Sequence, residues 1–158
     1  MNPTKQLLLA MAIVPLVALA AGNMRGRDGH GQTASQNAGK PGDPASVTRT
    51  VKVAMHDTMR FTPDKISVKA GDTVRFVVRN TGKVEHEMVI GTSSELREHA
   101  HLMRNMPMAR HAEANQVSLA PGQQGVLIWK FDRPGTVDFA CLMPGHYEAG
   151  MVGKVTVK

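Results

Sequence analysis

Three potential metal ligands lie close together near the C-terminus, and their chemical types indicate a metal. Cys141, His146 and Met151 offer a thiolate, an imidazole and a thioether within eleven residues, and four residues separate each from the next. This donor set suits copper and suits magnesium, calcium or manganese badly. Blue-copper sites use a second histidine, and His86, in the segment 80–88, is the best-placed candidate. The sequence therefore predicts one type 1 copper ion with four protein ligands: His86, Cys141, His146 and Met151.

Other roles for the same residues stay open on this spacing alone. Zinc sites take Cys, His and carboxylate ligands, which would leave Met151 without a role. A cysteine nucleophile with a histidine base is a second alternative, although no third group that would orient the base is evident. A single cysteine at the end of an apolar strand is also often a small buried hydrophobic residue. The short loop favours a shared ion over these alternatives.

The same loop resembles the C-terminal signature of the cupredoxins, the plastocyanin and azurin group. The resemblance rests on residues 135–141, the turn at 144–146 and Met151, and it extends over residues 48–158. It implies a site in which Cys141 makes the strong bond and the two histidines complete a trigonal plane. Met151 would then be a weak axial ligand that tunes the potential.

Two further features refine the resemblance. Residues 86–90 and the insert at 95–111 are similar to those of small periplasmic cupredoxins associated with copper tolerance. In plastocyanin and azurin, an asparagine follows the first histidine ligand and ties the two ligand loops together, whereas this chain has Glu87. We therefore expect the bond between the loops to be absent or to be made differently.

The N-terminus has the pattern of a secretory signal peptide. Lys5 precedes an apolar run from Leu7 to Ala20, and the small residues at 18–20 offer a cleavage site near Ala20. Residues 21–47 are rich in Gly, Asn, Gln, Asp and Pro, which predicts a flexible leader. These features predict a periplasmic protein that loses residues 1–20 and has no stable membrane insertion.

Composition limits the remaining possibilities. The 158 residues leave room for one folded domain, which we place at residues 48–158. A single cysteine excludes an internal disulfide and a dicopper centre, which needs two cysteines. The formal net charge of +6 suits an acidic partner. One Trp, one Tyr and no block of Lys or Arg argue against a nucleic-acid partner.

From residue 48 onwards, the chain consists of short apolar runs separated by Gly and Pro turns. Apolar residues recur at every second position, or form short runs, in seven segments: 51–55, 61–68, 73–78, 88–90, 127–131, 137–141 and 152–157. Such strands predict an all-β fold, a β-sandwich, and the resemblance implies its Greek-key, cupredoxin-like form. The phase of the strand that precedes Cys141 places this cysteine on the core side.

One short helical insert, at about 94–108, interrupts the strands. A serine cap and Glu95 in the first turn are typical of a helix start, and Pro107 should end the helix. Imidazole and thioether groups bind Cu(I), so five insert residues are candidates for a second, exchangeable copper site: His99, Met103, Met106, Met108 and His111. Methionines also fill core gaps and form docking surfaces, and both interpretations stay open.

These observations predict a monomeric periplasmic type 1 copper protein that transfers single electrons, contributes to copper tolerance, or does both. The alternative is a copper sequestration or delivery protein that uses the Met/His-rich insert as a second site. The partner is accordingly a redox protein or a copper donor or acceptor. An enzyme is not expected, because copper oxidases and nitrite reductases need further domains and several histidine pairs, and only two of the seven histidines are convincingly placed.

Overall fold

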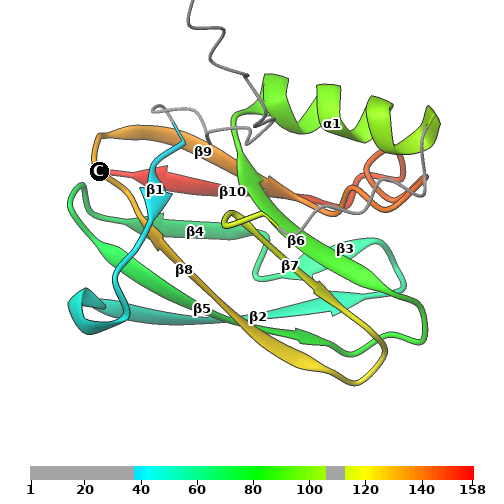
Figure 1. Cartoon of the computed structure of the whole chain (residues 1–158), viewed down its shortest axis with the longest axis horizontal. Coiled ribbons are helices and arrows are strands. Elements are labelled where there is room, and N and C mark those ends of the chain that lie inside the picture. The colour runs from blue at the N-terminus through cyan, green and yellow to red at the C-terminus, as the bar shows by residue number, and fades with distance from the viewer. Residues whose placement is uncertain (1–37, 106–112) are drawn as a thin grey trace, which may run out of the picture. The chain divides into compact units, whose positions relative to one another are not determined.

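Alternating apolar residues build two five-stranded sheets in the part of the chain that the computed structural model describes, residues 38–105 and 113–158 (Figure 1). The first sheet contains, in spatial order, β1 (Lys40–Pro41), β8 (Gln124–Lys130), β5 (Thr73–Asn80), β2 (Arg49–His56) and β3 (Arg60–Thr62). The second contains β4 (Lys65–Val68), β10 (Val152–Val157), β9 (Gly135–Ala140), β6 (His86–Gly91) and β7 (Gln116–Leu119). Parallel pairing joins β2 to β5 and β4 to β10, and the other neighbours pair antiparallel.

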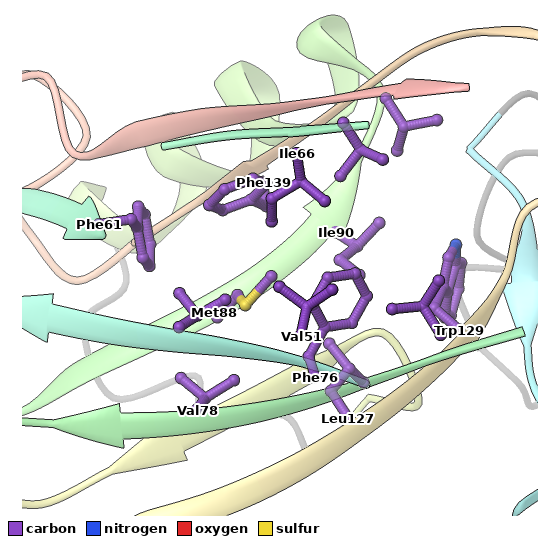
Figure 2. Packing of buried hydrophobic residues seen from close by; sticks show 14 of the residues in the cluster. Val51, Phe61, Ile66, Phe76, Val78, Met88, Ile90, Leu127, Trp129 and Phe139 are labelled. Atoms are coloured by element: carbon purple, nitrogen blue, oxygen red, sulfur yellow. The ribbon is translucent and has the colours of Figure 1, made fainter. Parts of the chain in front are cut away.

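The inward side chains of both sheets form one hydrophobic core (Figure 2). Phe76 and Trp129 are fully buried in it. Phe61 and Phe139 meet edge to face with ring centroids 5.0 Å apart, a favourable arrangement for aromatic rings. Cys141 belongs to the same core, as the phase of its strand predicted.

Helix α1 (Ser93–Asn105) forms the insert and packs on β6 and β9 (Figure 1). Its start is a capping box: Thr92 N donates to Glu95 Oε2 at 2.8 Å, and Glu95 N donates to Thr92 Oγ1 at 3.4 Å. Leu96 and Ala100, four residues apart on one helix face, are buried against the second sheet. The capping residue is therefore Thr92, and the prediction of a serine cap was wrong, because the helix begins one residue earlier than expected, at Ser93. Pro107 lies outside the described residues.

Residues 38–47 fall within the predicted leader, yet in the structure they lie against the first sheet. β1 pairs with β8, and Trp129 Nε1 donates to Ala38 O at 2.6 Å. A short 3-10 helix, η1 (Pro44–Ser46), follows and is capped by the side chain of Asp43. This contact is made by backbone pairing and by one hydrogen bond from Trp129, and neither requires apolar side chains in residues 38–47. For this reason the polar composition of the segment did not predict the contact. The predicted signal peptide and the rest of the predicted leader lie outside the described residues.

The prediction of an all-β sandwich with one helical insert is confirmed for the described residues. Two strands, β1 and β7, were not predicted, because β1 has only two residues and the alternation in β7 is limited to Val117 and Leu119. β6 begins at His86 itself, two residues earlier than expected. No helix among residues 38–105 and 113–158 has the length and apolar character to cross a membrane.

Candidate metal centre

Three of the four predicted ligands meet in the folded chain. One potential ligand atom from each of His86, Cys141 and His146 lies within 4.8 Å of the other two. Cys141 Sγ lies 3.2 Å from His146 Nδ1 and 4.0 Å from His86 Nδ1. Within the described residues, this is the only such group of three or more His, Cys, Asp or Glu side chains. Both imidazoles therefore present the same nitrogen to one thiol.

Two neighbouring strands of the second sheet deliver these side chains. His86 opens β6, and Cys141 directly follows the end of β9. The two strands pair antiparallel with Val89 opposite Ala140, which brings the start of β6 beside the end of β9. The register of the sheet thus brings His86 next to the loop that begins at Cys141.

Backbone hydrogen bonds shape the loop from Cys141 to Met151. Cys141 N donates to Met151 O at 3.0 Å, and Met151 N donates to His146 O at 3.0 Å. Gly145 has a φ of +86°, a left-handed conformation that glycine adopts without steric cost, and it turns the chain at His146. The loop therefore closes on itself and holds its three potential ligands together.

Met151, the fourth predicted ligand, is fully buried in the hydrophobic core. Its backbone bonds place it beside Cys141 and His146. A thioether is a weak, uncharged metal ligand. Its sulfur can remain in an apolar environment without a hydrogen-bond partner. The position therefore suits a weak sulfur ligand at the core side of the loop.

Burial controls the protonation of the site. It raises the pKa of the Cys141 thiol to about 12, although Glu87 N donates to Sγ at 3.4 Å. Burial, together with the proximity of His86, lowers the pKa of His146. At neutral pH the metal-free site thus holds a protonated thiol and a neutral His146 imidazole, and a bound metal ion displaces the thiol proton. A thiolate with two imidazoles and a thioether fits copper.

Glu87 makes the bond between the two ligand segments, where plastocyanin and azurin use asparagine. The side chain is 6% exposed, Oε1 accepts from Leu142 N at 3.0 Å, and Oε2 accepts from Ser118 Oγ at 3.1 Å. Leu142 follows Cys141 directly, so the carboxylate connects β6 to the ligand loop. Burial raises the pKa of Glu87, while these two hydrogen bonds act in the opposite direction. The bond between the two ligand segments is therefore present but made differently, by the carboxyl group of Glu87 in place of an asparagine amide.

Replacing Glu87 with alanine should lower the free energy of unfolding of the metal-free protein by about 1–3 kcal/mol, because a buried donor, Leu142 N, loses its partner. Glu87→Gln keeps an acceptor oxygen for this donor and should cost clearly less. Chemical denaturation of both variants and the wild type measures the difference. Equal losses in the two variants would show that the bond to Leu142 N does not stabilise the fold.

The structure describes two of the five insert candidates for a second copper site. Met103 is buried, and His99 lies partly exposed on α1. The other three candidates, Met106, Met108 and His111, lie outside the described residues.

Sequence reasoning missed one residue at the site. Asp57 Oδ1 lies 3.1 Å from His86 Nε2, on the opposite side of the ring from Nδ1. Asp57 is 29 residues from His86 in the sequence and stands in a polar turn after β2. No spacing or periodicity links such a residue to the metal ligands.

Comparison with known proteins agrees with this geometry. The family model described as copper binding proteins, plastocyanin/azurin family, matches residues 47–158. The chain belongs to this family. The cupredoxin is 51% identical over 129 residues to the copper-resistant cuproprotein CopI of Rubrivivax gelatinosus, an alignment that covers 82% of this chain and 78% of that protein.

Further relatives extend the comparison. The cupredoxin is 34% identical to the copper-resistant cuproprotein CopI of Pseudomonas aeruginosa, with 96% of this chain and 97% of the relative covered. Among solved structures, auracyanin B matches with a TM-score of 0.63 and 26% identity, over 77% of this chain and 99% of that chain.

Family membership confirms the predicted Greek-key, cupredoxin-like sandwich and copper as the cofactor. Two histidines and one cysteine gather at the site, and Met151 is joined to Cys141 and His146 by backbone hydrogen bonds. Together these residues have the composition of a type 1 copper centre. Cupredoxins are copper proteins that exchange electrons with redox partners and are not enzymes, which agrees with the prediction from the sequence.

Proposed function

We propose that this cupredoxin is a periplasmic type 1 copper protein that contributes to copper resistance. One copper ion is held by His86, Cys141, His146 and Met151. The observation that carries the proposal is the convergence of one thiol and two imidazole nitrogens within 4.8 Å. The similarity to two proteins named copper-resistant cuproproteins supports the role in resistance. The predicted signal peptide supports the periplasmic location.

The ligands differ in their contact with solvent, and this difference suggests how electrons enter. His86, Cys141 and Met151 are fully buried, whereas His146 is partly exposed. Bound copper supplies one-electron chemistry by alternating between Cu(II) and Cu(I). The buried ligands exclude water and hold their positions in the core, and the His146 edge faces the surface where a redox partner docks. A monomer is sufficient for this function.

The contacts of the insert favour this function over copper sequestration or delivery through a second site. Leu96 and Ala100 pack against β6 and β9, with Tyr147 of the ligand loop beside them. Arg104, in the last turn of α1, pairs with Glu148 of the same loop at 3.2 Å. The described part of the insert therefore contacts and stabilises the proposed copper-binding loop.

Growth in copper tests the proposal. A copper-sensitive host that exports the wild-type protein should grow at copper concentrations that stop the host alone. The Cys141→Ser variant should give no protection at equal periplasmic amounts, and Val126→Thr, an exposed substitution on β8, should protect fully. Fractionation and immunodetection confirm location and amount. Protection by Cys141→Ser equal to that of the wild type would overturn the proposal, because resistance would then not depend on the copper site.

A further inference from the structure

The carboxylate of Asp57 contacts His86, a potential copper ligand, at the ring nitrogen that faces away from Cys141. Asp57 Oδ1 lies 3.1 Å from His86 Nε2, while His86 Nδ1 faces Cys141 Sγ at 4.0 Å. The histidine side chain is fully buried, and that of Asp57 is 39% exposed. An ionised carboxylate can only accept a hydrogen bond, so Nε2 carries the hydrogen and Nδ1 keeps its lone pair. The pair therefore selects the tautomer that can bind a metal through Nδ1.

Backbone donors fix the carboxylate in turn. Lys83 N donates to Asp57 Oδ2 at 2.7 Å, and Val84 N lies 3.4 Å from Oδ1. A Cβ at Gly82 would clash with Oδ1, so a residue without a side chain at this position leaves room for the carboxylate. An aspartate side chain is ionised at neutral pH, and these contacts hold its carboxylate beside His86 Nε2.

The turn that supplies these donors leads directly into His86. The Asn80 side chain donates to Val84 O at 2.8 Å and accepts from Gly82 N at 2.9 Å. Thr81 N donates to Met55 O of β2 at 3.0 Å. Asp57 follows β2, in the first sheet, and His86 opens β6, in the second. The carboxylate is thus held by a hydrogen-bonded turn that connects the two sheets at the copper site.

We infer that Asp57 is a positioning residue for the copper ligand His86. Asp57 orients the His86 imidazole and makes Nδ1 a stronger ligand atom for copper. The inference rests on the proposed function, in which His86 binds copper. A carboxylate that accepts the second N–H of a ligating histidine fixes its ring orientation and raises its basicity. A more basic ligand stabilises Cu(II) more than Cu(I), so Asp57 lowers the reduction potential of the site.

The variant Asp57→Asn removes the charge and keeps the size. It should weaken Cu(II) binding by about 10–100-fold and raise the reduction potential, because the neutral amide is a weaker acceptor for Nε2–H. Asp72→Asn is the matched control: Asp72 also accepts from a backbone N–H, that of Lys69 at 2.8 Å, and from the Thr48 hydroxyl, but contacts no histidine. This control should leave affinity and potential unchanged. Competition titration and redox titration give the two values.

Nitrogen-15 NMR of the metal-free protein provides a readout that does not depend on copper. His86 of the wild type should carry its hydrogen on Nε2, and Asp57→Asn should shift the Nε2–H resonance or move the hydrogen to Nδ1. A wild-type Nδ1–H tautomer would overturn the inference. So would an Asp57→Asn protein with unchanged His86 resonances and potential, since Asp57 would then only cap its turn. A wild type with the Nε2–H tautomer but without copper binding would contradict the proposed function instead, and would leave Asp57 as the residue that sets the tautomer.

Discussion

Replacing Cys141 with serine should abolish the intense charge-transfer band that the wild-type protein develops when Cu(II) is added. The band requires a thiolate bonded to Cu(II), and an alcohol cannot donate charge in the same way. The thiol is fully buried, and a bound metal ion is needed to displace its proton, because burial raises the pKa of this group to about 12. Optical titration of the metal-free protein with Cu(II) measures the result.

A control on the same loop separates this effect from general damage. Met143 packs against the core without belonging to the ligand set, so Met143→Leu should keep the band. Serine is close to cysteine in size, and the metal-free Cys141→Ser protein should therefore retain the far-ultraviolet circular dichroism of the wild type. A wild-type protein that stays colourless with copper and takes zinc tetrahedrally would contradict the ligand assignment.

The thioether of Met151 and the imidazole of His146 should respond differently to substitution. Met151→Leu should keep copper and colour and raise the reduction potential, because loss of a weak thioether ligand would destabilise Cu(II) more than Cu(I). Leucine also preserves apolar volume in the core and should cost less than about 1.5 kcal/mol of stability. His146→Ala should weaken copper binding and change the colour, because it removes a donor that lies 3.2 Å from Cys141 Sγ.

Copper affinity, optical spectra and redox titrations of the two variants test this division of roles. His101→Ala is a useful control, since this histidine lies exposed on α1 and contacts none of the described ligands. Complete loss of copper from Met151→Leu would show that Met151 is a strong ligand. Unchanged copper binding in His146→Ala would remove His146 from the ligand set.

Much of the site could be predicted from the sequence because three of its ligands share one short loop. Cys141, His146 and Met151 lie within eleven residues, so the chain itself keeps them close, and their chemical types indicate copper. The apolar alternation of the strand before Cys141 likewise predicted that the thiol faces the core, where it is found. These features depend on local spacing and periodicity, which the sequence contains directly.

Contacts between distant segments were beyond this kind of reasoning. Glu87 is separated from the Cys141 sulfur by 54 residues, and Asp57 lies 29 residues before His86. Strand β1 was likewise not predicted from the polar residues at 38–47. It is held by backbone pairing with β8 and by a hydrogen bond from Trp129, which is distant in the sequence. Residue types alone do not say which of many polar side chains will meet a given ligand.

The sequence by itself determined the metal, the ligand loop and the all-β architecture, and only the tertiary structure decided how His86 and its neighbours reach that loop. The deciding factor is the register of β6 on β9, with Val89 opposite Ala140. Continued by two residues, this register sets Glu87 opposite Leu142, where the hydrogen bond between them forms. A slip of one residue would turn every side chain of β6 to the other face of the sheet and separate these groups. Register results from the packing of the whole sandwich, and for this reason it is absent from any short stretch of sequence.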